Sequence, residues 1–157
     1  MVSGRAAEDI YGISLNGTGC DHAATRSRRD QIRTSRLAAA VTPDPGDAVI
    51  SFKGTGRRTL DALVVDFDAD TVTCSDCGHV HCSPSENLLP HLREICTPLK
   101  AAGPVRGEDY DVGRFRLRQL CCSGCGTMVD VQVALNGAPR PFFRIDSWTS
   151  PSALHQE

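Results

Sequence analysis

Two short cysteine motifs of identical spacing constrain this chain more than any other feature. CSDCG at 74–78 and CSGCG at 122–126 are both Cys-x-x-Cys-Gly units. Such a unit can be a redox dithiol, half of a disulfide framework or half of a metal site. The rest of the sequence has to discriminate between these three.

The compartment that the sequence predicts for this chain, the cytoplasm, argues against disulfides. The chain has 157 residues, of which eight are cysteines. Its first residues, 1–12, lack the apolar stretch of a secretory signal peptide. No apolar run reaches the length of about 18 residues that a membrane helix needs. We therefore expect a cytoplasmic protein, in which thiols stay reduced and dense cysteines usually bind metal.

The spacing of the two motifs is typical of a zinc ribbon. Structural zinc sites use four thiolates, and each Cys-x-x-Cys turn supplies two of them. Gly78 and Gly126 allow positive φ, which lets backbone N–H groups point at the sulfurs. Such a closed site leaves no open position, so the Zn²⁺ is expected to be structural. The predicted ligands are Cys74, Cys77, Cys122 and Cys125.

Other assignments of the thiols remain open but are less favoured. His79, His81 and Cys82 are alternative ligands close to the first motif. A redox role is less favoured, because redox motifs open a helix and the second motif leads into a strand. Cys20 and Cys96 are expected to be ordinary thiols, and Cys121 a small buried residue that points away from the metal.

The periodicity predicts a mostly β (α+β) fold, namely a zinc-ribbon-like small β domain preceded by an N-terminal strand and a basic helix. The helix is expected from Asp21, its N-cap, to about residue 40. A shorter helix, limited by Pro90, is expected within 85–96. Predicted strands are 10–15, 48–53, 60–67 and 115–121.

The end of the chain shows the clearest strand pattern. Apolar residues alternate with polar ones from Val129 to Leu135, which predicts a strand with one apolar face. The Asn-Gly pair at 136–137 is a hairpin turn signal, and 141–145 is expected to return as a strand. The expected organisation is a docking tail (1–41), a zinc-ribbon-like β domain (48–147) and a C-terminal tail (148–157), with 42–47 as linker.

The predicted basic helix needs a partner. Residues 22–40 carry five arginines against one aspartate, and their apolar stripe is thin. A helix of this kind is marginal alone in water, so it is expected to dock on another chain. The candidate docking residues are Tyr11, Arg26, Arg29 and Arg33. Binding to nucleic-acid phosphates is an alternative. Against it, only 5% of the residues are aromatic, too few for a base-stacking platform.

Two segments around the cysteine motifs resemble one protein family. RLRQLCCSGCGTMVDVQVALNGAPRPFFRID (116–146) resembles the C-terminal part of the acetone carboxylase gamma subunit family. TCSDCGHVHCSPSENL (73–88) resembles the first Cys-x-x-Cys-Gly-His motif of that family. Ser123 replaces the family's usual proline, and Cys121 its aromatic residue. Neither change removes a ligand, and the resemblance covers about 59–147.

A third segment resembles a larger protein. DIYGISLNGTGCDHAATRSRRDQIRTSR (9–36) is similar to the C-terminal tail of the hydantoinase B/oxoprolinase family, to which large subunits of acetone and acetophenone carboxylases belong. The matching features are Tyr11-Gly12, Asp21, Ala24-Thr25 and the arginines.

Together, these resemblances imply a non-catalytic, zinc-binding accessory subunit of an ATP-dependent ketone carboxylase. Its partners would be large hydantoinase A-like and hydantoinase B-like chains, which would carry the substrate pocket, the ATP and a divalent metal. A related complex that hydrolyses cyclic amides with ATP is the alternative.

Overall fold

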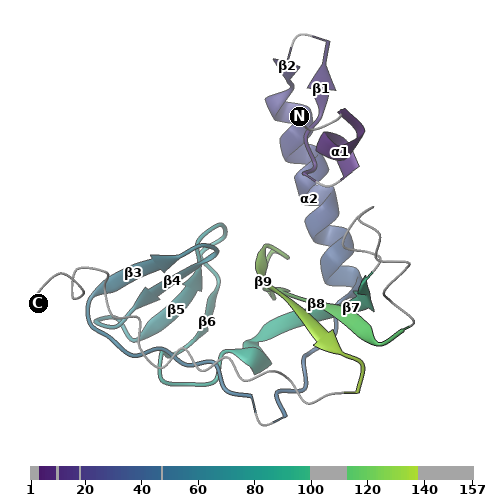
Figure 1. Ribbon diagram of the computed structural model, residues 1–157. Coiled ribbons are helices and arrows are strands. Elements are labelled where there is room, and N and C mark those ends of the chain that lie inside the picture. Colours follow the sequence, from purple (N-terminus) through teal and green to yellow (C-terminus); the bar gives the residue numbers. More distant parts are fainter. Residues whose placement is uncertain (1–3, 10, 18, 47, 100–112, 138–157) are drawn as a thin grey trace, which may run out of the picture. The chain divides into compact units, whose positions relative to one another are not determined.

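The chain folds into two units, residues 1–39 and 40–157. The computed structural model (Figure 1) describes residues 4–9, 11–17, 19–46, 48–99 and 113–137. These residues form mostly β structure, with one long helix and three small antiparallel sheets, which confirms the predicted fold class. In these ranges, no helix is both long enough and apolar enough to cross a membrane.

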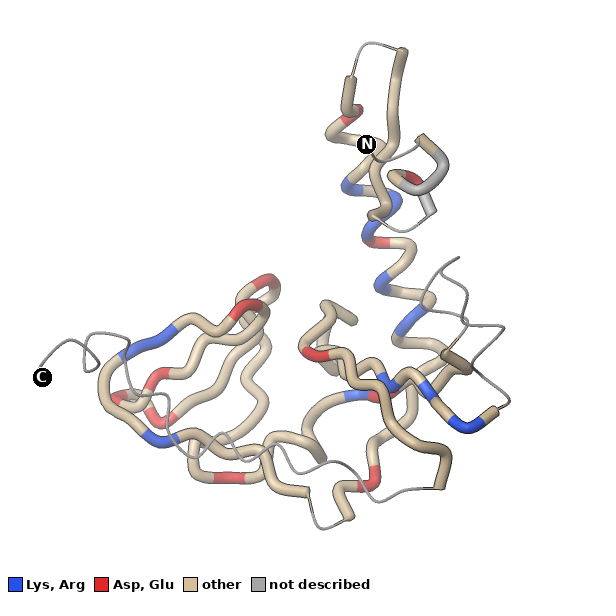
Figure 2. Tube along the Cα trace, in the orientation of Figure 1, with Lys and Arg blue, Asp and Glu red and all other residues tan. Residues whose placement is uncertain are grey.

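Unit 1 is built around the predicted basic helix. Helix α2 (His22–Ala39) begins directly after Asp21, whose side chain accepts a hydrogen bond of 2.9 Å from the amide of Ala24. This is the expected N-cap. Helix α2 is preceded by a short helix, α1 (Gly4–Asp9), and by a hairpin of β1 (Leu15–Asn16) and β2 (Gly19–Cys20). The arginines follow one another along α2, as Figure 2 shows.

The predicted strand at 10–15 is wrong over 11–14, only Leu15 belongs to a strand, and residue 10 lies outside the described residues. Residues 11–14 pack on α2 instead of pairing with a strand. The amide of Ser14 donates to the hydroxyl of buried Thr25 at 3.0 Å, and Arg29 Nε donates to the carbonyl of Tyr11 at 3.4 Å. Gly12 has φ of 60°, and a Cβ on it would lie 3.0 Å from Ile32 Cδ1, so both the backbone conformation and the close contact favour glycine.

Unit 2 contains a four-stranded antiparallel sheet with the order β3-β4-β5-β6. The strands are β3 (Arg57–Leu60), β4 (Leu63–Asp66), β5 (Thr71–Cys74) and β6 (Val80–Cys82). The single strand predicted at 60–67 is therefore interrupted by the turn between β3 and β4. Asp61 occupies this turn with φ of 45°, a left-handed conformation that aspartate tolerates better than most residues.

One face of this sheet forms much of the core. Leu63 lies opposite Cys74, and Val65 lies opposite Val72, and all four side chains are buried. The pairing places Cys74 at the end of β5 on the core face.

The predicted strand at 48–53 is also wrong. These residues form no strand, and their backbone hydrogen-bonds to the loop that follows β6. The amide of Phe52 donates to the carbonyl of Pro84 at 2.7 Å, and the amide of Leu88 donates to the carbonyl of Ile50 at 2.8 Å. Asn87 completes the contact, because its side chain accepts from the amide of Ile50 at 3.0 Å.

A three-stranded antiparallel sheet completes unit 2. It consists of β7 (Leu92–Pro98), β8 (Phe115–Cys122) and β9 (Met128–Leu135), with β8 in the centre. The predicted helix at 85–96 is wrong, since only a 3-10 turn, η1 (Leu89–His91), precedes β7. The proline within η1 has no amide hydrogen to continue a helix. The predicted strand at 115–121 is confirmed, and the return strand at 141–145 lies outside the described residues.

The two sheets of unit 2 share a hydrophobic core. It contains Leu63, Val65 and Val72 from the first sheet and Leu92 and Leu120 from the second. The apolar face predicted for β9 is only partly covered. Its outer residues Val131, Val133 and Leu135 are each about half exposed.

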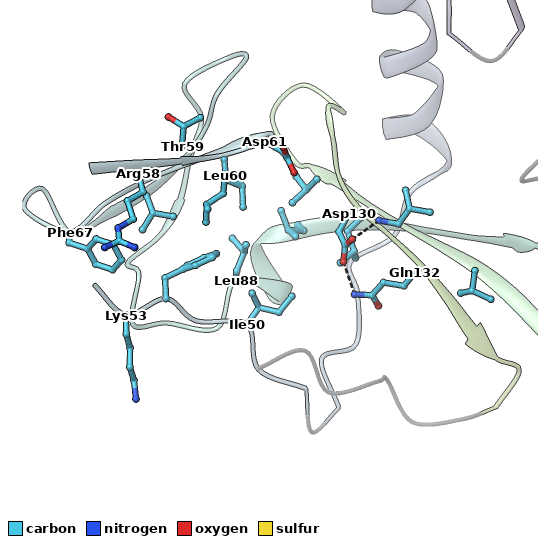
Figure 3. A pocket seen from close by; sticks show the side chains of 18 residues that line it. Ile50, Lys53, Arg58, Thr59, Leu60, Asp61, Phe67, Leu88, Asp130 and Gln132 are labelled. Atoms are coloured by element: carbon cyan, nitrogen blue, oxygen red, sulfur yellow. Dashed lines mark hydrogen bonds between the residues drawn. The ribbon is translucent and has the colours of Figure 1, made fainter. Parts of the chain in front are cut away.

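An open apolar groove of about 940 Å³ lies between β3 and β9 (Figure 3). In the sheets formed by the described residues, both strands are edge strands. Core side chains such as Phe52 and Leu120 line the groove. Asp130 covers part of the β9 edge, because its carboxylate accepts 2.7 Å hydrogen bonds from the amide of Val131 and the side chain of Gln132.

Candidate metal centre

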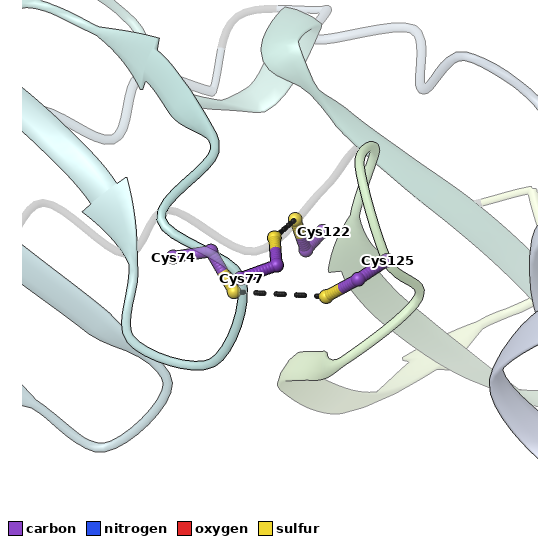
Figure 4. Close-up of side chains that lie close together, drawn as sticks. All are labelled: Cys74, Cys77, Cys122 and Cys125. Atoms are coloured by element: carbon purple, nitrogen blue, oxygen red, sulfur yellow. Dashed lines mark hydrogen bonds between the residues drawn. The ribbon is translucent and has the colours of Figure 1, made fainter. Parts of the chain in front are cut away.

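The structure brings the four predicted cysteines together (Figure 4). Cys74 ends β5 and Cys122 ends β8, so each stands at the start of a hairpin loop. Cys77 and Cys125 lie within the same two loops. We call residues 74–79 the first cysteine turn and residues 122–127 the second cysteine turn. All four sulfurs lie within 4.8 Å of one another, so the group can hold a metal ion.

The sulfur separations exclude a disulfide framework in this structure. Cys74 Sγ lies 3.8 Å from Cys125 Sγ, and Cys77 Sγ lies 3.9 Å from Cys122 Sγ. A disulfide bond would bring two sulfurs to about 2.05 Å. All eight cysteines of the chain are free. The sulfurs of the two turns therefore face one another without being joined.

The two cysteine turns have the same backbone structure. In each, the amide of the glycine donates to the carbonyl of the first cysteine, at 3.0 Å and 2.9 Å. The amide of that first cysteine donates to the carbonyl five residues later, at 2.9 Å and 2.8 Å. Gly78 and Gly126 have φ of 72° and 75°. Glycine adopts this left-handed conformation at little cost, which explains why a glycine follows the second cysteine of each turn.

Polar side chains connect the two turns. Thr127 in the second turn donates from its hydroxyl to Asp76 in the first, at 2.7 Å. A second contact joins the same two turns, because His79 Nε2 in the first turn lies 3.1 Å from Ser123 Oγ in the second. These contacts hold the two loops in register. The sequence did not predict these contacts, since it named His79 only as an alternative ligand and Ser123 only as the replacement of a proline.

The thiols of the group differ in acidity. Burial raises the pKa of Cys77 and of Cys122. Burial also acts on Cys125, but hydrogen bonds involving Thr127 and the neighbouring sulfurs outweigh it and lower the pKa of Cys125 to about 7. A metal cation has to displace the protons of the thiols whose pKa is raised, so its binding is expected to weaken at acidic pH.

The alternative ligands lie outside the four-sulfur group. His79 contacts Ser123, as described above. His81 is buried, which lowers its pKa, and its Nδ1 lies 3.3 Å from the carbonyl oxygen of His91. Burial and the nearby carboxylate of Glu86 raise the pKa of Cys82 to about 11.

The remaining thiols are separate from the group as well. Cys121 is fully buried in β8, as expected for a small core residue. Cys20 and Cys96 are exposed.

The predicted docking residues belong to unit 1. Tyr11, Arg26 and Arg29 are exposed. Arg33 is half-buried and lies 3.7 Å from the carboxylate of Asp30, one turn earlier on α2. The carbonyl of Tyr11 is tied to Arg29, but the side chains of both residues remain accessible.

Replacing Gly124 with alanine is expected to push the two turns apart. A Cβ at this position would lie 2.9 Å from both Cβ and Cγ of His79. Overpacking of this kind costs about 1–3 kcal/mol. Thermal unfolding and zinc retention against a competing chelator would both measure the effect. The double variant Gly124→Ala, His79→Gly removes both contacting atoms and should recover part of the loss.

The matched control is Gly19→Ala. A Cβ there meets no atom within 4 Å, so stability should hardly change. Equal stability of wild type and Gly124→Ala would show that the close approach of the two turns is not required.

No protein-family model matches the chain, and no curated protein or solved structure matches it either. The function of the four-sulfur group is therefore inferred from its geometry and from the sequence.

Proposed function

We propose that this chain is a zinc-binding accessory subunit of a multisubunit, ATP-dependent ketone carboxylase. The four-sulfur group is the observation that supports its zinc-binding part, and the resemblance of 73–88 and 116–146 supports its carboxylase part. The four-sulfur group has the donor set of a closed structural site, in which all four ligands come from the protein. Such a site stabilises a fold without taking part in a reaction.

The separations between the sulfurs favour zinc. A tetrahedral zinc ion with Zn–S bonds of about 2.3 Å places its sulfurs about 3.8 Å apart. Two of the separations across the group are 3.8 Å and 3.9 Å, and all four sulfurs lie within 4.8 Å of one another. These separations are compatible with a Zn²⁺ ion between the two turns.

Two surfaces support a role within a complex. Helix α2 carries arginines along its length (Figure 2), of which Arg26, Arg28 and Arg29 are exposed. Strand β9 leaves three apolar side chains about half exposed beside the groove. Contiguous exposed apolar surface often marks an interaction site. In the proposed complex, which we place in the cytoplasm, the hydantoinase A-like and B-like partners carry ATP, a divalent metal and the substrate pocket.

Copurification from the host tests this proposal. A tagged copy of the chain is expected to bring down two much larger chains in defined stoichiometry. The isolated chain should contain tightly bound zinc but should not hydrolyse ATP. A chain that elutes alone as a monomer under several buffer conditions would contradict the proposal.

The chemistry of the recovered complex separates the two related activities. A carboxylase would consume bicarbonate and ATP with a ketone. A hydantoinase-like complex would open a cyclic amide with ATP and without bicarbonate. The resemblance at 73–88 and 116–146 favours the carboxylase.

Nucleic-acid binding is the second candidate, because α2 carries five arginines and one aspartate. Phosphate contacts make affinity fall steeply with salt. A salt-dependent gel shift with DNA or RNA at micromolar protein would support this candidate. The absence of a shift in low salt would eliminate it.

Reversing the charge of Arg29 and Arg33 to glutamate is expected to weaken assembly with the large subunits by at least tenfold. The zinc content should not change, because both arginines lie in unit 1 and all four sulfurs in unit 2. Sedimentation or pull-down at defined concentrations measures the first effect and metal analysis the second. The control, Arg57→Glu with Arg114→Glu, makes the same charge change at exposed positions of unit 2. Equal loss of assembly in both pairs would point to net charge and not to α2.

A further inference from the structure

A second group of metal-binding side chains lies in unit 2, apart from the four sulfurs. Cys82 ends β6, Glu86 lies in the loop that follows, and His91 ends η1. The sulfur of Cys82, a carboxylate oxygen of Glu86 and a ring nitrogen of His91 lie within 4.8 Å of one another. No residue of this group belongs to the four-sulfur group. In the described part of the chain, these two groups are the ones in which three or more such donors lie close enough to hold a metal ion.

The backbone of this loop is held by hydrogen bonds at both ends. The amide of Ser83 donates to Glu86 Oε2 at 2.9 Å, and the amide of Glu86 donates back to the carbonyl of Ser83 at 3.1 Å. Asn87 fixes the next residues, because its Oδ1 accepts from the amides of Ile50 at 3.0 Å and Leu89 at 3.3 Å. The positions from which the three donors project are therefore set before any ion arrives.

The burial of the three side chains also suits a metal. Cys82 belongs to the hydrophobic core and is 8% exposed, whereas Glu86 and His91 are exposed. An ion can therefore approach from solvent on the side of the two exposed ligands and reach a sulfur that belongs to the core. Donors around a zinc ion lie about 2.0–2.3 Å from it. The three donor atoms already lie within 4.8 Å of one another, and the second carboxylate oxygen of Glu86 could bind the ion while Oε2 accepts from Ser83.

We propose that Cys82, Glu86 and His91 form a second metal site, which binds Zn²⁺ or another divalent first-row ion through three protein donors. A thiolate, an imidazole and a carboxylate are all ligands of such ions. Three protein donors leave a fourth coordination position open to water, as in zinc sites that exchange ligands. With three donors, two of them exposed, the ion in this site is expected to be held less tightly than the one held by four sulfurs, and thus to be exchangeable. The proposal does not depend on the role in a carboxylase.

Zinc stoichiometry in the full chain tests the second site. After saturation with Zn²⁺ and gel filtration, the wild type is expected to hold two equivalents, and a weak chelator should remove one of them. His91→Ala and Glu86→Gln should each retain only the equivalent that resists the chelator. Both residues are exposed, so these variants leave the core intact, whereas Cys82 is part of it. The affinity for the exchangeable ion should fall more than about 100-fold, since even the loss of an outer partner costs about 10–100-fold.

Cobalt adds a spectroscopic readout. With the four-sulfur group filled by Zn²⁺, Co²⁺ in the second site should give a charge-transfer band from a single thiolate in the wild type, and none in His91→Ala. The control, His22→Ala, removes an exposed histidine of unit 1 and should keep both equivalents and the band. One equivalent of zinc in the saturated wild type would overturn the proposal. So would unchanged binding of the second ion in His91→Ala, which would show it to be adventitious.

Discussion

Replacing Cys125 with serine is expected to release the tightly held metal ion and to unfold much of unit 2. The Cys125 sulfur lies 3.8 Å from Cys74 Sγ, so its loss opens the group on the side where the two turns meet. Structural zinc contributes about 10–16 kcal/mol to folding in small zinc domains. Domains of this size have a total stability of only about 5–15 kcal/mol. We therefore expect the free energy of unfolding to fall by about 4 kcal/mol or more.

Metal analysis after chelator treatment and thermal unfolding by circular dichroism measure the two parts of this prediction. The matched control is Cys96→Ser, which changes an exposed thiol outside both metal groups. That variant should keep its tight zinc and its melting temperature. Unchanged zinc content and melting in Cys125→Ser would refute the ligand assignment.

Replacing Leu92 with alanine is expected to cost about 2–5 kcal/mol, the usual range for a buried leucine. Leu92 is 1% exposed and belongs to the core that joins the two sheets of unit 2. It also pairs with Cys122 across β7 and β8. The truncation should therefore lower the midpoint of denaturant unfolding, while the folded protein keeps its tight zinc.

Leu135→Ala provides the control for the same chemical change. Leu135 is 50% exposed, and truncation at such a position usually changes stability by no more than about 0.5 kcal/mol. A similar loss in both variants would mean that Leu92 does not contribute to a common core. Loss of tight zinc from folded Leu92→Ala would show that core packing and metal binding cannot be separated.

The sequence predicted those parts of the fold that local patterns determine. The four cysteines could be chosen because the spacing within each turn is short and because thiolates bind zinc in fours. Helix α2 could be placed because Asp21 is a local cap. Strands β8 and β9 could be placed because their patterns are long and regular. None of these predictions required knowledge of distant contacts.

The wrong predictions concern segments whose partners are distant in sequence. Residues 48–53 have the composition of a strand, but Asn87 and its neighbours take up their backbone hydrogen bonds. Residues 85–96 alternate between helical and extended preferences, and the path around Pro90 is decided by the burial of Leu88 and Leu89. The group of Cys82, Glu86 and His91 was missed although its donors lie close together in sequence, because a helix was expected over 85–96 and only the observed loop brings the three donors together.

The metal centre joins positions that are far apart along the chain, at sequence separations of 45 and 51 residues between facing sulfurs. The entropy of closing a flexible loop grows only logarithmically with its length, so that doubling the length costs about 0.6 kcal/mol. Insertions and deletions in the surface connections between the two cysteine turns should therefore be tolerated during evolution. A single residue added inside either turn would move a sulfur away from the ion. The span between the turns is thus free to diverge in length, whereas each turn is not.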